Sequence, residues 1–304
     1  MSHGGGGKAI VAALGANLAI AAAKVVGFLV TGSSSMLAEA VHSFADSGNQ
    51  VLLLVGGRRA QRNADERHPF GYGRDRYFYA FVVALVLFTL GSLFAGYEGI
   101  DKIRHPHHLD TPLIAIGILA FAILAESFSF RTAVSEARPL KGSVSWGQYI
   151  RRAKSPELPV VLLEDFAALI GLVLALGGVT MTLVTDDPVW DGIGTLSIGL
   201  LLGVVAVVLS VEMKSLLIGE AASGESVDAI RAALVDGTSV LRVIHLKTLH
   251  LGPDELLVAA KIAVAPGLAL PAVARAIDEA EARVRVVEPL ARLMYLEPDL
   301  DRTP

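Results

Sequence analysis

The chain has 304 residues, of which 53% are hydrophobic and only 18% are charged. Soluble domains carry about 25% charged residues, so the composition argues against an ordinary soluble enzyme. The net charge of −4 gives no indication of nucleic-acid binding. Without cysteine, the chain can form no disulfide, cysteine-type zinc finger or thiol nucleophile. Any metal or acid–base chemistry therefore depends on His, Asp and Glu.

Long apolar runs occupy the chain as far as residue 217. A helix needs roughly 20 mainly apolar residues to cross the hydrocarbon layer, and six segments qualify. They are 9–30, 36–55, 77–97, 113–130, 160–184 and 193–211. We therefore expect residues 1–217 to form a membrane-embedded, all-α bundle of six transmembrane helices.

The basic residues predict how this bundle is oriented. The loops after the second and fourth expected spans are rich in Arg and Lys, whereas those after the first and fifth contain neither. Because basic residues accumulate on the cytoplasmic side of a membrane, we expect both termini in the cytoplasm. We take the membrane to be the inner membrane of a bacterium.

From residue 218 onward the composition is that of a soluble domain. Amphipathic helical spacing alternates there with short β-branched or alternating runs. The expected elements are a helix over 227–235, strands over 240–251 and 255–264, a helix over 270–284 and a strand over 290–296. This αββαβ order predicts a small ferredoxin-like α+β domain over 218–304, on the cytoplasmic side, which can serve as a dimerisation surface.

Several polar residues lie inside the expected second span. Glu39, His42, Asp46 and Asn49 follow at spacings of three, four and three, which places all four on one stripe of a helix. A charged side chain at the bilayer centre costs about 2.5–3.5 kcal/mol. Such residues therefore need a role, either in binding an ion or in pairing with one another or with Lys24 to hold the bundle together.

The expected fifth span adds two adjacent carboxylates, Glu164 and Asp165. Neighbouring helical positions point about 100° apart, so one can be a ligand while the other supports it or carries a proton. Together with His42 and Asp46 they offer three or four nitrogen and oxygen ligands without sulfur. That set suits Zn²⁺ or a similar transition metal better than Mg²⁺ or Ca²⁺, which prefer oxygen alone.

A loop after the second span offers a weaker candidate. Asp65 and His68 lie within residues 65–74 and could bind a second metal, but two ligands are few. A plain turn that carries a surface histidine is the alternative.

These motifs together resemble a known family. The segments that carry the resemblance are 36–46 (MLAEAVHSFAD), 68–74 (HPFGYGR), 146–159 (WGQYIRRAKSPELP), 162–171 (LLEDFAALIG) and a tail that contains Leu296-Glu297-Pro298. With six spans and an αββαβ tail, the chain resembles a cation diffusion facilitator. Asn49-Gln50 and the segments 146–159 and 162–171 narrow the resemblance to the zinc transporter nine-like subgroup.

The resemblance implies a secondary transporter rather than an enzyme. It implies exchange of Zn²⁺, or of Mn²⁺, Fe²⁺, Co²⁺ or Cd²⁺, for protons by alternating access in a homodimer within the lipid bilayer, with no prosthetic group. The family's ligand pair in the second span corresponds to His42 and Asp46. In the fifth span, Val161 stands where the family has His or Asp four residues before the position of Asp165.

Two further departures concern the family's other metal sites. Tyr72 replaces the second histidine of the loop motif, and Tyr295 stands where many relatives have His in the tail. We therefore expect the binuclear cytoplasmic zinc site to be absent or degraded.

Two other functions fit the same residues. A membrane-anchored metal sensor or scaffold would bind metal without transporting it. A transporter of organic cations would use Asp46 and Asp165 as counter-ions.

Overall fold

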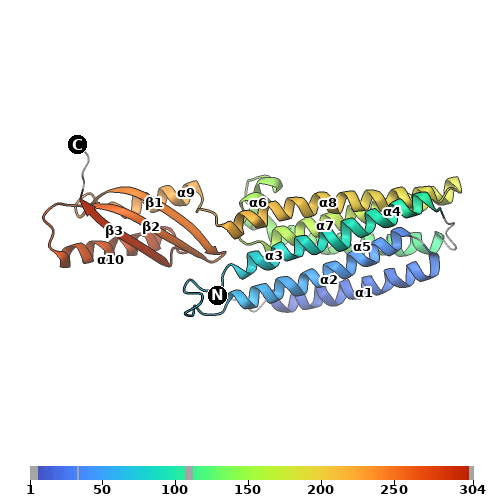
Figure 1. Ribbon diagram of the computed structural model, residues 1–304, viewed down its shortest axis with the longest axis horizontal. Helices are drawn as coiled ribbons and strands as arrows, with labels where there is room; N and C mark the ends of the chain where they lie inside the picture. Colours follow the sequence, from blue (N-terminus) through green and yellow to red (C-terminus); the bar gives the residue numbers. More distant parts are fainter. Residues whose placement is uncertain (1–5, 33, 107–111, 301–304) are drawn as a thin grey trace. The chain divides into compact units, whose positions relative to one another are not determined.

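The computed structural model describes residues 6–32, 34–106 and 112–300, without the side chains of 6–13, 15, 16, 34, 35, 38, 39, 42 and 112. The chain forms two compact units. The first unit comprises the chain up to Arg58 together with Arg76–Lys214, and the second comprises Arg59–Asp75 together with the chain from Ser215 onward. Figure 1 shows helices throughout the first unit, and a β-sheet with helices in the second.

The first unit is built from long helices. They are α1 (Gly6–Thr31), α2 (Ser34–Ala60), α3 (Asp75–Val86), η1 (Leu87–Leu93), α4 (Phe94–Arg104), α5 (Pro112–Lys141), α6 (Trp146–Arg152), α7 (Glu157–Thr185) and α8 (Val189–Ile218). The segments α3, η1 and α4 run on as one helix with a π-helical stretch in the middle.

Within the described residues, four helices are long and apolar enough to cross a membrane. They are Asp75–Arg104, Leu113–Lys141, Glu157–Thr185 and Val189–Ile218. These four confirm the third to sixth expected spans. The 27-residue α2 is also long enough to cross, but its polar stripe lowers its mean hydropathy, and α1 contributes a shorter apolar stretch over Asn17–Thr31.

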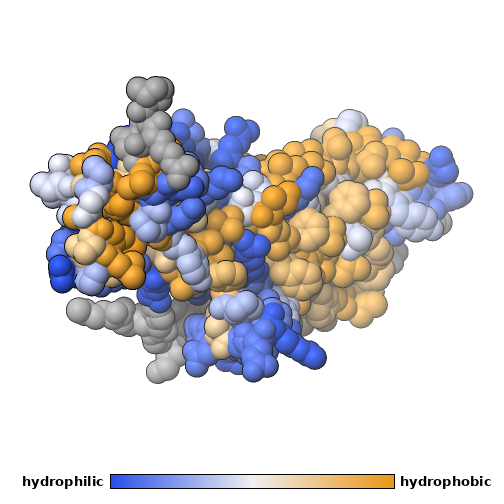
Figure 2. Space-filling view, turned by 60° about the vertical axis from the view of Figure 1, so that its left-hand side comes forward, coloured by the Kyte–Doolittle hydropathy of each residue, from blue (hydrophilic) through white to orange (hydrophobic). Residues whose placement is uncertain are grey.

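The outer surface of this unit is apolar. Large side chains such as Leu124, Phe128 and Leu200 are 71–75% exposed, and Figure 2 shows hydrophobic residues spread over the helical unit. Soluble monomers rarely expose contiguous apolar patches of this extent. In a bilayer the same side chains face lipid, so the surface is that of an integral membrane protein.

Close glycine contacts bring α8 against α4. A Cβ on Gly99 would lie 2.5 Å from the backbone nitrogen of Leu196, and one on Gly199 would lie 2.7 Å from that of Gly96. Without a hydrophobic driving force between helices in lipid, such small residues allow the close packing that holds them together.

The segment between α5 and α7 folds back onto both helices. Helix α5 continues eleven residues beyond the expected span end at 130, to Lys141, because Ala133 and Ala137 pack against Tyr149 of α6 and Leu162 of α7. The short α6 was not expected from the sequence, although its capping box is a recognisable signal: Ser145 Oγ accepts from the Gln148 backbone, and the Gln148 side chain accepts from the Ser145 backbone.

The second unit is a small α+β fold. Its elements are α9 (Gly224–Leu234), β1 (Val240–Gly252), β2 (Glu255–Val264), α10 (Leu270–Val287) and β3 (Leu293–Leu300). The central strand β2 pairs antiparallel with β1 and parallel with β3. Alternate β2 residues, including Val258 and Ile262, are buried with Ile230 of α9 and Ala280 of α10 in one core.

The last strand begins three residues later than expected. Residues 288–292 form a turn in which Ala291 N donates to Glu288 O, while Leu290 O accepts from the Leu256 backbone. The expected start at 290 was wrong because apolar residues of this turn enter the core and extend the strand-like pattern.

The loop over 59–75 packs within this second unit, against the β1–β2 turn. A Cβ on Gly73 would lie 2.8 Å from the carbonyl oxygen of Leu251, and one on Gly252 would lie 2.9 Å from Gly73 Cα. The two backbones therefore approach as closely as only glycine permits.

Candidate functional site

Polar side chains from α2 and α7 meet in the interior of the first unit. Asn49 is fully buried, and Glu164 and Asp46 are 4% and 8% exposed. The Asn49 side-chain amide donates a hydrogen bond of 2.8 Å to Glu164 Oε1. The carboxylate of Asp46 is among the charged groups that act electrostatically on Glu164. Two carboxylates and an amide thus share one buried region.

The amide of Asn49 has capacity left for a ligand. Its Oδ1 atom is buried and accepts no hydrogen bond within the described part of the chain. A buried carbonyl oxygen without a donor carries a desolvation cost of about 1–3 kcal/mol. A cation bound beside Asp46 and Glu164 would offset that cost, so the donor set fits a metal ion.

The remaining residues of the α2 stripe lie partly outside the description. Helix α2 includes positions 39 and 42 in its backbone, but the side chains of Glu39 and His42 are outside the described residues. Among the side chains that the structure describes, no three His, Cys, Asp or Glu residues come together as a metal-binding group. Of the predicted ligand set, the structure describes the side chains of Asp46, Asn49, Glu164 and Asp165.

Asp165 faces a different helix from Glu164. Its Oδ2 accepts a hydrogen bond of 3.0 Å from Ser129 Oγ of α5, and buried Glu126, one turn earlier on α5, acts on it electrostatically. Ser129 was not among the site residues predicted from the sequence. The spacing in the sequence could have indicated it, because Glu126 and Ser129 are three residues apart and so share one face of a helix.

Two other positions in the first unit have local packing roles. Lys24 of α1 is 1% exposed and donates a hydrogen bond of 2.7 Å to Ser43 Oγ of α2. Val161, at the position where the family's span-five ligand was expected, packs against the apolar cluster formed by α5, α6 and α7. The chain thus uses this α7 position for packing.

In the loop, Asp65 is occupied by hydrogen bonds. Its carboxylate accepts from the backbone nitrogens of Arg67 and His68 and, at 2.6 Å, from the Tyr72 hydroxyl. The Tyr72 bond is the largest of the effects that lower the pKa of Asp65, and the same bond raises the pKa of Tyr72. His68 Nδ1 lies 3.4 Å from Asp65 Oδ1, and the His68 ring packs against the Tyr72 ring. This arrangement is that of a structured turn, as the alternative interpretation proposed.

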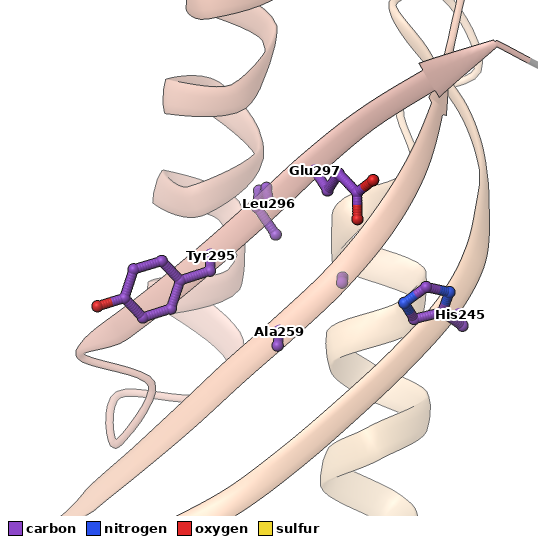
Figure 3. Close-up of a pocket in the computed structure, with 6 residues that line it drawn as sticks. His245, Ala259, Tyr295, Leu296 and Glu297 are labelled. Atoms are coloured by element: carbon purple, nitrogen blue, oxygen red, sulfur yellow. The ribbon is translucent and has the colours of Figure 1, made fainter.

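The second unit has a shallow cavity of about 280 Å³ on its sheet, lined by residues that include His245, Tyr295 and Glu297. In Figure 3 the Tyr295 ring points away from His245. Glu297 is bound to Lys261 at 3.0 Å, and that contact is the largest cause of the raised pKa of Lys261. His250 is buried elsewhere on β1. Of the lining side chains, Glu297 is thus engaged in an ion pair with Lys261.

Comparison with known protein families shows which family the chain belongs to. Residues 10–218 match the family model described as the cation efflux transmembrane domain. The chain belongs to the cation efflux family. This confirms the resemblance to cation diffusion facilitators, and the match takes in α2, α5 and α7.

The relatives of this cation efflux protein include transporters of metals. It is 33% identical over 256 residues to the proton-coupled zinc antiporter SLC30A9, mitochondrial, of Xenopus laevis, covering 83% of this chain and 45% of the relative. For the human protein of that name the values are 32% over 251 residues, 82% and 44%. Metal tolerance protein C4 of Arabidopsis thaliana is 29% identical over 262 residues, covering 84% and 56%. The chain thus spans about half the length of these curated relatives.

The relatives correct one expectation. The predicted location in the inner membrane of a bacterium is wrong, because the vertebrate antiporters that match most of this cation efflux chain are mitochondrial. The basic loops that suggested a location report orientation across a membrane and do not identify which membrane it is. The prediction that the chain is integrated into a membrane is unaffected by this correction.

Proposed function

We propose that this protein exchanges a divalent transition metal, Zn²⁺ foremost, for protons across a membrane by alternating access. The observation that carries the proposal is the buried contact between Asn49 of α2 and Glu164 of α7, with Asp46 beside it. Ionisable residues inside a membrane bundle mark ion pathways in many transporters. The relatives named as proton-coupled zinc antiporters support the same conclusion.

In this proposal the carboxylates of Asp46 and Glu164 hold the ion. His42, one turn before Asp46, supplies an imidazole nitrogen, and Asn49 Oδ1 or a water completes a site of four ligands. Mixed nitrogen and oxygen ligands favour Zn²⁺ over Mg²⁺ and Ca²⁺, while Mn²⁺, Fe²⁺, Co²⁺ and Cd²⁺ remain chemically acceptable substrates. We place the transported ion here rather than in the loop, where hydrogen bonds occupy Asp65.

The charge of the site couples the binding of metal to the release of protons. Carboxylate and imidazole groups bind metal only in their deprotonated forms, so metal binding releases protons. Two carboxylates in the apolar bundle are costly when both are charged and alone, and either protons or a divalent cation remove that cost. The empty carrier therefore returns with protons and the loaded carrier moves with metal, provided that the helices rock to expose the site alternately.

The finer architecture belongs to the same proposal. Six spans, with α1 and α2 as the first two, place the two termini on one side of the membrane. Residues 1–217 form the transport domain, and residues 218–304 form a ferredoxin-like domain through which two copies pair. Metal is then exported from the compartment that holds this domain.

Uptake into proteoliposomes tests the proposal. Purified protein is reconstituted, and Zn²⁺, Mn²⁺, Co²⁺ and Cd²⁺ entry is followed with and without a pH gradient. We expect gradient-driven Zn²⁺ flux that His42→Ala, Asp46→Asn and Glu164→Gln abolish. Ser47→Ala removes a hydroxyl that donates to the α2 backbone carbonyl of Ser43 and should preserve the flux. Metal binding without flux would instead indicate a membrane-anchored sensor or scaffold. An organic cation that competes with Zn²⁺ would indicate a transporter of organic cations.

A further inference from the structure

A basic segment joins the two membrane-length helices α5 and α7. Residues 131–154 include six basic residues and one acidic residue. The four arginines among them, Arg131, Arg138, Arg151 and Arg152, are all exposed. Within the part of the chain that the structure describes, none of their guanidinium groups forms an ion pair or a hydrogen bond. Their positive charge is therefore available to a partner outside the chain.

The lipid-facing side of α5 leads directly to two of these arginines. Leu124 and Phe128 are 71% and 75% exposed, and in a bilayer they face the hydrocarbon. Arg131 and Arg138 follow Leu124 at intervals of seven residues, and seven residues are close to two turns of a helix. All three therefore lie on one side of α5. The change from exposed apolar to exposed basic side chains on this side marks the level at which α5 leaves the hydrocarbon.

Packing holds the other two arginines near the first two. Helix α6 is anchored by Tyr149 and Ile150 to the apolar cluster that contains Ala133 and Ala137 of α5. Each of the four arginines stands next in sequence to a member of this cluster, namely Phe130, Ala137, Ile150 and Ala153. The arginines thus surround one packed core. They form a fixed surface of the first unit, at the end of α5.

An exposed tryptophan lies on the same surface. Trp146, the first residue of α6, is 38% exposed, and its ring meets the Tyr149 ring edge-on with centroids 6.3 Å apart. The Lys141 ammonium group lies 5.3 Å from the centre of the Trp146 ring and donates to the Val144 carbonyl. Tryptophan at the end of a membrane span favours the level of the lipid headgroups. Its position therefore agrees with that of the arginines.

We propose that this arginine surface, formed by Arg131, Arg138, Arg151 and Arg152 beside Trp146, binds the headgroups of anionic phospholipids. A guanidinium group can donate two parallel hydrogen bonds to a phosphate. Clusters of four to eight basic residues next to a transmembrane helix are typical of anionic-lipid recognition. An acidic protein would match the charge as well, but the continuity with the lipid-facing side of α5 favours lipid. The proposal goes beyond metal transport, because it assigns a partner to the segment between α5 and α7.

The fluorescence of Trp146 tests the proposal, because the chain contains only two tryptophans. In a Trp190→Phe background, Trp146 is the only one. The full chain is reconstituted in equal mixtures of phosphatidylcholine and phosphatidylglycerol, in which one lipid or the other carries brominated acyl chains that quench tryptophan on contact. Each basic residue near an anionic surface is worth about fivefold in affinity. We therefore expect brominated phosphatidylglycerol to associate with Trp146 at least about fivefold more strongly than brominated phosphatidylcholine.

Two pairs of substitutions separate the arginine surface from net charge. Arg151→Gln with Arg152→Gln should remove most of the preference for phosphatidylglycerol. Arg231→Gln with Arg275→Gln removes the same charge from exposed positions of α9 and α10 and should leave the preference unchanged. Salt at 0.5 M shortens the screening length to about 4 Å and should weaken the preference without any substitution in the surface. The salt series keeps the test decisive if the first pair does not fold.

Three results would overturn the proposal. Equal quenching by the two brominated lipids, or no quenching by either, would show that the surface does not select anionic headgroups. Loss of the preference in the α9 and α10 pair would show that net charge alone attracts the lipid. Loss of the preference on addition of inorganic phosphate at constant ionic strength would indicate a site for soluble phosphate instead. The measurement involves no metal, so its outcome is independent of whether the protein transports Zn²⁺.

Discussion

Replacing Asn49 by Leu isolates the contact between α2 and α7. Leu has nearly the same shape as Asn but can neither donate to Glu164 nor offer an oxygen to a metal. Asn49 is fully buried and its hydrogen bond to Glu164 measures 2.8 Å. A hydrogen bond to a charged group contributes about 1.5–3 kcal/mol, and about 1.4 kcal/mol is tenfold in affinity. We therefore expect Asn49→Leu to raise KM for Zn²⁺ about 10- to 100-fold.

The assay follows initial rates of Zn²⁺ entry into proteoliposomes over a range of metal concentrations, at a fixed pH gradient. Ser47→Ala is the control, because Ser47 is a buried polar residue of the same helix whose hydroxyl donates to the backbone carbonyl of Ser43. A KM for Asn49→Leu within twofold of the wild-type value, in protein that folds normally, would refute the assignment of Asn49 to the site.

Three further predictions concern the fold. Burial alone would raise the pKa of Asp236, but three backbone N–H groups donate to it and lower that pKa from 3.8 to about 2. The stabilisation that ionised Asp236 gives to the second unit is thus present above pH 3.8 and lost as the pH falls towards 2. Asp236→Ala should lower the free energy of unfolding of this unit by about 2 kcal/mol at pH 7, measured by hydrogen exchange. A difference between variant and wild type that persists undiminished at pH 2 would contradict this. Tyr72→Phe removes the bond to Asp65 and should speed tryptic cleavage of the loop several-fold; wild-type cleavage rates would argue against a structured turn. Gly199→Leu, which would place its Cβ 2.7 Å from the α4 backbone, should lower the unfolding temperature by several degrees, whereas Gly177→Leu, with open space around it, should not.

The sequence predicts the apolar spans better than their ends. Hydropathy locates the third to sixth spans because lipid requires about 20 apolar residues. It does not place the end of α5, since residues beyond 130 are amphipathic and their helix depends on Ala133 and Ala137 packing against Tyr149. It also does not reveal the π-helical stretch Leu87–Leu93, where local backbone geometry departs from the α-helical period.

For the candidate site, the sequence predicts which helices carry the polar residues but not which neighbouring helix each side chain contacts. The periodicity of α2 places Asp46 and Asn49 on one stripe, and adjacency of Glu164 and Asp165 predicts that they point apart. Which carboxylate faces α2 depends on donors from two other helices, and hydrogen bonds between helices leave no periodic signal. Ser129 is a small, common residue, and its hydrogen bond to Asp165 becomes apparent only when α5 and α7 pack together.

Simultaneous recording of metal and protons tests the central claim most directly. Proteoliposomes that contain a Zn²⁺-sensitive dye and a pH-sensitive dye report both ions in the same vesicles, with wild-type protein and Glu164→Gln compared. We predict that Zn²⁺ entry drives protons out, that an imposed pH gradient accelerates Zn²⁺ entry, and that Glu164→Gln loses both movements. Zn²⁺ entry that proceeds at the same rate with or without the gradient, and without proton exit, would contradict the account.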